Sequence, residues 1–316
     1  MFYLSLRLVL RLNTPSLMCN WPTTIDSFYH TQGCLEVYTS LIESFSGLLS
    51  ITDIPIIRHH ITMMPTMLTT TSTATAMIIG ATSQLSQALA RQLSEQNVSL
   101  VLFVPDPNLL TEFCRTLPGE VSVYPLNIVE PETLITQLTI AWEQHNGAHL
   151  VIVNTGVNHY DAALPWPIEQ DIIDVNVRGF AAISNCIFKL MCQQGYGQLA
   201  AINSIAGQRG GPNVAYHASK AFAVNYLQGL CMHAQRLKLP ITISDIQLGL
   251  FDKAVLLNTR FLLSPIDKVA TQILTALKKG KRRVYVTKRW RIVAWINRLL
   301  PEYIYNTRHW KPRKKS

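Results

Sequence analysis

The pair Tyr216 and Lys220 has the side chains and the spacing needed to transfer a proton. The two residues are four apart in a segment with helical periodicity, so they lie on one face of a helix, one turn from each other. A tyrosine hydroxyl ionises near pH ~10, and a neighbouring ammonium group stabilises the phenolate and lowers that pKa. The pair therefore predicts a general acid and base. By itself this spacing is weak support, because a Tyr and a Lys four residues apart occur by chance on many helices.

Two further polar residues, Ser204 and Asn176, accompany this pair in the sequence. Ser204 ends a short apolar run that is typical of a strand, and Asn176 lies in a predicted helix. Each has an ordinary alternative, since serine is common at strand ends and Asn176 could be a buried amide that pairs with backbone groups. The six cysteines are scattered without a C-x-x-C pair, which argues against a metal site and indicates a reduced, cytoplasmic protein.

The segment Gly80–Ser86 has the composition of a phosphate-binding loop. It joins the apolar run Met77–Ile79 to a segment with Leu85, Leu89 and Leu93 at helical spacing. A strand, a turn of small residues and a helix N-terminus together suit a dinucleotide, because the first backbone N–H groups of a helix point at an anion. Only the first glycine of the usual pattern is present, so an ordinary strand-to-helix turn explains this segment equally well.

Apolar runs typical of strands alternate with helical segments from residue 76 to residue 286. We expect strands at 77–79, 98–104, 121–126, 149–153, 198–203, 241–246 and 283–286. We expect helices at 84–96, around 110–113, and at 131–145, 168–192, 213–237 and 265–279. Strands that are apolar throughout are buried on both faces, and parallel strands are joined by right-handed crossovers. The sequence therefore predicts an α/β fold, a doubly wound, Rossmann-type parallel sheet of about seven strands with helices on both faces.

Six short segments, in order, resemble the motifs of the short-chain dehydrogenase/reductase family. They are Gly80–Ser86 (T-G-x-x-x-G-x-G), Asn154–Gly156 (N-A-G), Asn176–Gly179 (N-x-x-G), Asn203–Gly207 (the strand of the active-site serine), Tyr216–Lys220 (Y-x-A-S-K) and Gln247–Gly249 (the P-G turn). The likeness covers roughly residues 76–300, and it is greatest to uncharacterised bacterial oxidoreductases that use NAD(P).

The resemblance implies an enzyme that transfers a hydride between a nicotinamide and a carbonyl or secondary alcohol. In the family's roles, Tyr216 protonates the carbonyl oxygen and Ser204 orients it. Lys220 and the positive ring of the oxidised cofactor lower the pKa of Tyr216, and Lys220 also binds the nicotinamide ribose. Asn176 holds a water that supplies protons to Lys220. The apolar residues of segment 250–264 favour an apolar substrate.

The resemblance also implies which residues bind the dinucleotide. They are Gly80, Thr82, Ser83, Leu85, Asp106, Asn127, Asn154, Gly156, Tyr216, Lys220 and Gly249. Gln84 and Ser86 replace two of the family's loop glycines, and Asn127 replaces the aspartate that meets the adenine, so cofactor affinity is less certain than catalytic competence. Asp106, just after the second strand, could bind a ribose 2′-hydroxyl, which slightly favours NAD over NADP.

By composition the chain divides into three parts. Residues 1–75 lack periodicity and are expected to be a poorly ordered extension, or the true start is one of Met63, Met64, Met67 and Met77. Residues 76–287 form the predicted catalytic domain, and residues 288–316 a basic, Trp-rich helix and tail. Apolar residues make up 48% of the chain, but no run is long enough to span a membrane.

The positive charge of the chain is concentrated at one end. Residues 278–316 hold fourteen of the 28 Lys and Arg but only Glu302 of the 19 acids, a local charge of +13 against −4 elsewhere. Trp290 and Trp295 lie among these charges, which suits an amphipathic helix on an anionic membrane, but the apolar residues could equally pack on the core. Nucleic acid is not expected, since no known binding module accompanies the charges.

Two functions follow as hypotheses. The first is the NAD(P)-dependent oxidoreductase, assembled as a homodimer or homotetramer through the helices at 168–192 and 213–237. The second is a catalytically weak Rossmann-fold binding protein that acts through its basic tail at a membrane or polyanion. The pattern of losses favours the enzyme, because the chain has lost loop glycines while keeping Tyr216, Lys220, Ser204 and Asn176.

Overall fold

A computed structural model describes residues 74–249 and 265–306. The chain divides into two compact units, Met1–Thr69 and Thr70–Ser316, and the fold described here is that of the second. The predicted N-terminal extension, the apolar segment 250–264 and the last ten residues of the basic tail lie outside the described residues.

The described residues form a seven-stranded sheet in which every pair of neighbours is parallel. The strands are β1 (Thr75–Ile79), β2 (Ser99–Val104), β3 (Val121–Pro125), β4 (Leu150–Val153), β5 (Gly197–Ser204), β6 (Ile241–Leu248) and β7 (Arg283–Val286). Their order is β3-β2-β1-β4-β5-β6-β7, so the direction of winding reverses between β1 and β4. This confirms the predicted doubly wound sheet, and a reversal of this kind opens a crevice at the carboxyl ends of the strands.

The helices follow the predicted segments closely. They are α4 (Gln84–Ser94), α5 (Thr111–Arg115), α6 (Pro131–Gln144), α7 (Trp166–Ile173), α8 (Phe180–Gln194), α9 (Val214–Leu237), α10 (Ile266–Lys278), α11 (Lys288–Leu299) and α12 (Glu302–Asn306). Short 3₁₀ turns, η2 (Pro107–Leu110) and η4 (Ile205–Gln208), follow β2 and β5. The single helix expected at 168–192 is interrupted by a π-helical turn, Asp174–Gly179, which contains Asn176.

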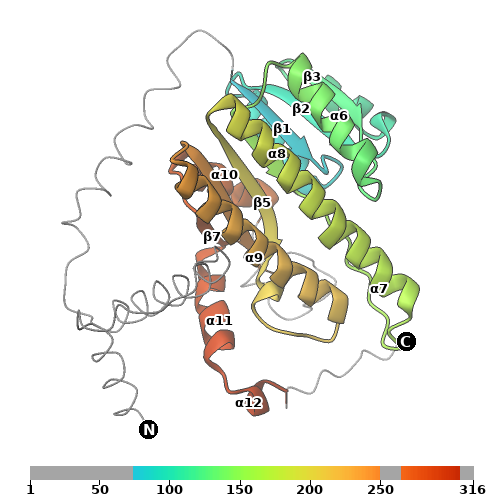
Figure 1. Ribbon diagram of the computed structural model, residues 1–316, viewed down its shortest axis with the longest axis vertical. Coiled ribbons are helices and arrows are strands. Elements are labelled where there is room, and N and C mark those ends of the chain that lie inside the picture. The colour runs from blue at the N-terminus through green and yellow to red at the C-terminus, as the bar shows by residue number, and fades with distance from the viewer. Residues whose placement is uncertain (1–73, 250–264, 307–316) are drawn as a thin grey trace, which may run out of the picture. The chain divides into compact units, whose positions relative to one another are not determined.

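Alternate residues of each strand face opposite cores, as expected for a sheet that is covered on both sides. Met77 and Ile79 of β1 pack with residues of α6, α8 and α9, whereas Ala76 and Ile78 pack with residues of α4 and α10. In Figure 1, α8 and α9 cross in front of the sheet. Burial on both faces therefore explains the apolar runs of the sequence. The polar residues at the carboxyl ends of these strands lie outside the two cores, where they can contact a ligand.

Candidate active site

The first turn of α9 fixes the position of Tyr216. Asn213 precedes the helix, and its side-chain oxygen accepts a hydrogen bond from the Tyr216 N–H at 3.3 Å. The side-chain amide of Asn213 donates to the side-chain oxygen of Asn158 at 2.6 Å and to the carbonyl of His159 at 2.8 Å. One buried asparagine thus starts the helix that carries Tyr216 and attaches it to the segment that follows β4.

Ser204, Tyr216 and Lys220 are brought together at the end of β5. Ser204 is the last residue of that strand, and its side chain lies close enough to the Tyr216 hydroxyl to lower the pKa of that group. The Lys220 Nζ lies 5.6 Å from the centroid of the Tyr216 ring, one turn further along α9. The predicted arrangement of hydroxyl, phenol and ammonium group is therefore present in the structure.

Burial dominates the electrostatics of this group. It lowers the pKa of Lys220 to about 8, because a charged ammonium is poorly solvated there. Burial also raises the pKa of Tyr216, although the hydrogen bond from Ser204 acts in the opposite direction. In the protein without a dinucleotide, desolvation of the phenolate thus outweighs the effect of Ser204. The lowering expected from the sequence includes the positive ring of the oxidised cofactor, so it stays a prediction for the complex. A tyrosine with a raised pKa is protonated at neutral pH and can act as an acid.

Asn176 is buried, and its side-chain amide forms hydrogen bonds mainly with backbone groups. Its oxygen accepts from the Val157 N–H at 2.8 Å, and its nitrogen donates to the Val157 carbonyl at 2.9 Å and to the Ser219 hydroxyl at 3.2 Å. It therefore ties the segment after β4 to α9, as the ordinary alternative to its family role anticipated. A Cβ added to Gly156 would lie only 3.0 Å from the Lys220 Nζ and 3.1 Å from the Asn176 oxygen, so this glycine belongs to the same cluster.

The loop between β1 and α4 is held together by serine hydroxyls. The Ser86 hydroxyl donates to the Gly80 carbonyl at 2.8 Å, and the Asn154 amide donates to the hydroxyls of Ser83 and Ser86 at 2.7 and 2.8 Å. Gly80 has φ +85°, and a Cβ there would collide with the Asn154 carbonyl, so glycine is required. Asn154 therefore binds the loop from the neighbouring strand.

This loop leaves the start of α4 available to an anion. Ser83 caps the helix by accepting from the Ser86 N–H, and no partner within the helix is available to the N–H groups of Gln84 and Leu85. The Gln84 side chain is exposed, and so is that of Thr82. Ser86 replaces a family glycine without filling the space above the loop, because it is fully buried beneath it. The geometry thus fits a dinucleotide pyrophosphate.

The remaining predicted cofactor residues are placed differently from one another. The exposed carboxylate of Asp106 accepts from the Asn108 N–H at 3.0 Å and caps η2 at the end of β2. The exposed amide of Asn127 is bound within its own turn, donating to Glu130 at 2.8 Å. Gly249 follows β6, and a Cβ there would collide with the indole ring of Trp290 in α11. The absence of a side chain at Gly249 thus makes room for the Trp290 ring, in addition to any contact with the cofactor.

A buried polar network behind Ser204 was missed by the sequence analysis. Asn203 accepts from the Ser204 N–H at 2.9 Å and donates to the Lys220 carbonyl at 3.4 Å and to Asp245 at 3.3 Å. Asp245 also accepts two bonds from Gln247 and forms an ion pair of 3.1 Å with Arg283. Burial raises the pKa of Asp245, while these hydrogen bonds and Arg283 oppose the rise. The signal was Asp245, the one charged residue of β6.

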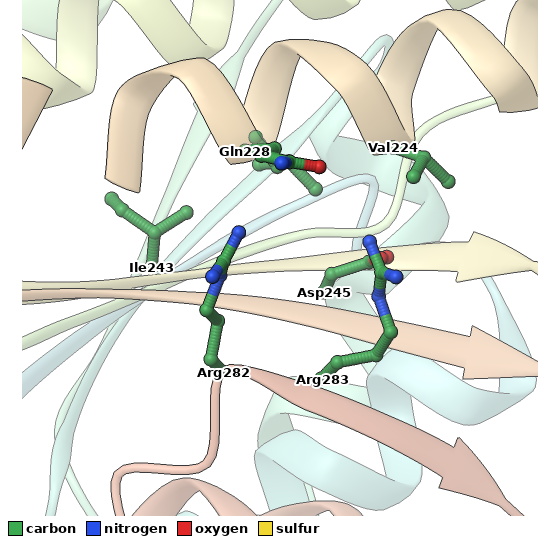
Figure 2. A pocket seen from close by; sticks show the side chains of 7 residues that line it. Val224, Gln228, Ile243, Asp245, Arg282 and Arg283 are labelled. Atoms are coloured by element: carbon green, nitrogen blue, oxygen red, sulfur yellow. The ribbon is translucent and has the colours of Figure 1, made fainter. Parts of the chain in front are cut away.

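Figure 2 shows Asp245 and Arg283 side by side on neighbouring strands, facing Val224 and Gln228 of α9. The crevice they line has a volume of only about 10 Å³, enough for a single water, so it is no ligand site. The network instead supports the strand end that presents Ser204.

The second missed contact joins the C-terminal helices to the active-site loop. The Arg209 guanidinium donates to the Leu300 carbonyl and lies over the Tyr305 ring, 4.3 Å from its centroid. The Tyr305 hydroxyl donates to the Gly210 carbonyl at 2.9 Å. Arg209 and Gly210 directly follow η4, the turn after Ser204, so α11 and α12 are attached to one rim of the site.

The geometry of the site agrees with a comparison of the whole domain with known families. Residues 74–260 match the family model described as short chain dehydrogenase. The chain belongs to this family. Short-chain dehydrogenases are oxidoreductases that use NAD(P). Among residues 74–249 and 265–306, no group of three or more His, Cys, Asp and Glu is placed to hold a metal ion.

Named relatives and solved structures agree with this assignment. An uncharacterized oxidoreductase of Myxococcus xanthus is 30% identical over 49% of this chain and 64% of that protein. One of Staphylococcus aureus is 26% identical over 65% of this chain and 91% of its own length. A short-chain dehydrogenase from Streptomyces avermitilis superposes with a TM-score of 0.63 at 18% identity, covering 72% of this chain and 93% of that one. A metagenomic short-chain oxidoreductase in complex with NADP superposes with a TM-score of 0.58 at 18% identity, covering 67% of this chain and 96% of that one. At these identities the structures show the fold alone.

Proposed function

We propose that this short-chain dehydrogenase reduces a carbonyl compound, and oxidises the corresponding secondary alcohol, with Tyr216 as the acid and base. The observation that carries the proposal is the placement of Ser204 beside the Tyr216 hydroxyl, with Lys220 one turn further along the same helix. Two neighbouring hydroxyl groups can both donate a hydrogen bond to a single carbonyl oxygen. The Tyr216 hydroxyl is protonated at neutral pH, because burial raises its pKa, so a proton is present there at the start of the reduction.

In this proposal each described residue has a separate task. Ser204 and Tyr216 orient the carbonyl oxygen, and the Tyr216 hydroxyl gives its proton to that oxygen as the alcohol forms. Lys220, with a pKa of about 8, is mainly protonated at pH 7 and stabilises the phenolate that remains. Asn176 and Asn203 act as positioning residues, since their side chains hold the backbone around Ser204, Lys220 and Val157. The bound nicotinamide would supply or accept the hydride.

Replacing Tyr216 by Phe tests the assignment, because it removes the proton donor and little volume. Turnover of accepted aldehydes or ketones, followed as oxidation of NADH or NADPH, is expected to fall by a factor of ~10²–10⁴. Tyr226→Phe is the matched control: Tyr226 lies on the same helix, and its hydroxyl makes one long hydrogen bond of 3.5 Å to the Ala181 carbonyl. Wild-type turnover in a folded Tyr216→Phe variant would refute the assignment.

We further propose that NAD(H) is bound more tightly than NADP(H). The Asp106 carboxylate is exposed at the end of β2, where it would accept a bond from a ribose 2′-hydroxyl and repel a 2′-phosphate. Titration with NADH and with NADPH, followed by nicotinamide fluorescence, is expected to give the lower Kd for NADH. Asp106→Ser should narrow the difference. If NADPH binds more tightly to the wild-type protein, the preference is reversed and Asp106 does not set it.

The apolar substrate remains a prediction from the sequence, since the segment 250–264 lies outside the described residues.

We also propose that two copies associate through α8 and α9. A groove of about 650 Å³ runs between these helices and is lined by apolar side chains that include Phe188, Tyr226 and Leu230. An apolar groove of this size, formed by the two helices α8 and α9, fits a second copy of the chain better than a small ligand.

A further inference from the structure

Helix α11 has one face packed on the domain and an apolar face toward solvent. Trp290 and Ala294 are 5% and 3% exposed, and the Trp290 ring covers Gly249 at the end of β6. On the other side of the helix, Trp295 is 64% exposed, and Ile292, Ile296 and Leu299 are exposed as well. Some of the apolar side chains of α11 thus pack on the core, as one of the two alternatives for the tail expected, and others do not.

The exposed residues form a continuous stripe. Ile292, Trp295, Ile296 and Leu299 recur at intervals of three and four, which places them on one face of the helix, and we call them the outer stripe. Tyr303 of α12, 72% exposed, extends the apolar surface beyond Pro301. Helix positions that face water are normally polar, so a stripe of four large apolar side chains indicates a surface that binds something.

Charge narrows the choice of partner. Arg291 and Arg298 are exposed and are seven residues apart, so they line up along α11 at the edge of the outer stripe. The sequence from 278 to 316 carries +13, while the rest of the chain carries −4. Two copies that met through this helix would bring two strongly positive segments together, which disfavours self-association here. An anionic surface with an apolar interior is complementary to both the stripe and the arginines.

We propose that the outer stripe of α11 binds the surface of an anionic lipid bilayer, with the helix lying in the plane of the interface. Trp295 and Leu299 would enter the boundary between headgroups and acyl chains, while Arg291 and Arg298 would contact the headgroups. With 12 residues, α11 is too short to cross the bilayer. Because Arg209 contacts Leu300 and Tyr305, the bound protein would hold its active-site loop near the membrane.

The test is co-sedimentation of the full chain with lipid vesicles. We expect the protein to sediment with phosphatidylcholine vesicles that contain phosphatidylglycerol, to be partly released as salt is raised, and to remain in solution with phosphatidylcholine alone. Failure to sediment with the anionic vesicles at low salt would overturn the proposal. It would leave the proposed enzymatic function intact, since the dehydrogenase assay needs no vesicles.

Two pairs of variants separate the stripe from general basicity. Trp295→Ser with Leu299→Ser should weaken partitioning at least tenfold, and Arg291→Gln with Arg298→Gln should weaken it about fivefold for each arginine. The matched controls are Leu109→Ser with Ile140→Ser, which are 62% and 47% exposed elsewhere, and Arg91→Gln with Arg115→Gln, which are also exposed. These controls should bind as the wild type does.

Melting temperatures establish that each variant is folded. Sedimentation of the stripe variant at the wild-type level would show that the charges alone bind lipid, and this would refute a role for the outer stripe. If the stripe variant instead changes the mass of the protein in solution and leaves vesicle binding unchanged, the stripe contacts a second copy, and the membrane proposal fails.

Discussion

Burial is the property of Tyr216 and Lys220 that the spacing of the sequence did not reveal. Four residues of separation correctly predicted that the two side chains share a face of α9. The spacing could not show that the pKa of Lys220 falls to about 8 or that the pKa of Tyr216 rises, because both shifts arise from burial of these side chains in the folded domain. A charged amine in this buried position costs folding stability.

That cost gives a test at the level of one residue, Lys220→Met. A pKa lowered from 10.5 to about 8 corresponds to at most about 3.5 kcal/mol, at ~1.4 kcal/mol per unit. Between pH 8 and 10.5 the unfolded chain binds more protons at this lysine than the folded protein does, so wild-type stability rises with pH across that window. Below pH 8 the penalty is complete. The inactive Met variant should therefore be more stable than the wild type at pH 7, with an advantage that fades toward pH 10.5.

Urea denaturation at pH 7 and pH 10 measures this difference. Lys268→Met, at an exposed position of α10, is the control and should show no such dependence on pH. A Lys220→Met variant that is less stable than the wild type at both pH values would mean that the lysine side chain stabilises the fold by packing, and that burial of its charge costs little.

At the scale of elements, the sequence located the loop after β1 but not how it is built. The departures from the family pattern at Gln84 and Ser86 suggested a poorer fit to the cofactor. The structure instead shows Gln84 exposed and Ser86 buried, hydrogen-bonded to Gly80 and Asn154. Such bonds depend on residues seventy positions apart in sequence meeting at adjacent strands, which no local pattern encodes. The same holds for the π-helical turn, in which Asn176 makes two hydrogen bonds to the backbone of Val157, nineteen residues earlier in the chain.

Restoring the family glycine at position 86 is therefore expected to harm this protein. Ser86→Gly removes the side-chain hydrogen bond to the Gly80 carbonyl and one of the two bonds that the Asn154 amide donates, and it adds a flexible residue to the first turn of α4. The free energy of unfolding should fall by about 2 kcal/mol, and the Kd for the dinucleotide should rise, both measurable by denaturation and fluorescence titration.

Gln84→Gly is the matched control within the same helix turn. Its side chain is exposed, so the loss of stability should stay within about 1 kcal/mol and the Kd should not change. Tighter binding by the Gln84→Gly variant would show that the glutamine crowds the pyrophosphate after all. Unchanged stability of Ser86→Gly would show that water replaces the serine hydroxyl.

At the scale of the whole molecule, the alternation of apolar and helical segments was sufficient for the sheet. Each predicted strand is present to within a few residues, because parallel strands buried on both faces leave a strong apolar signal. The contacts of the C-terminal helices were not predictable in the same way. Trp290 and Trp295 look alike in sequence, yet one packs on Gly249 and the other faces solvent. Only the orientation of α11 on the domain distinguishes them. No described helix is both long and apolar enough to cross a membrane.

Gly229 offers a direct way to test the proposed association of two copies through the groove between α8 and α9. A Cβ added to Gly229 would meet nothing within 4 Å, so the isolated domain has room for a larger residue at this exposed position of α9. Replacing a glycine within a helix also favours the helix, by up to about 1 kcal/mol. Gly229→Glu should therefore keep or raise the melting temperature while placing a charge where a second copy would pack.

If α8 and α9 form the dimer interface, light scattering with size-exclusion chromatography should give a dimer for the wild type and for Gly229→Ala, and a monomer for Gly229→Glu. A Gly229→Glu protein that remains dimeric would place the interface elsewhere, and a wild-type protein that is monomeric would remove the groove's proposed partner.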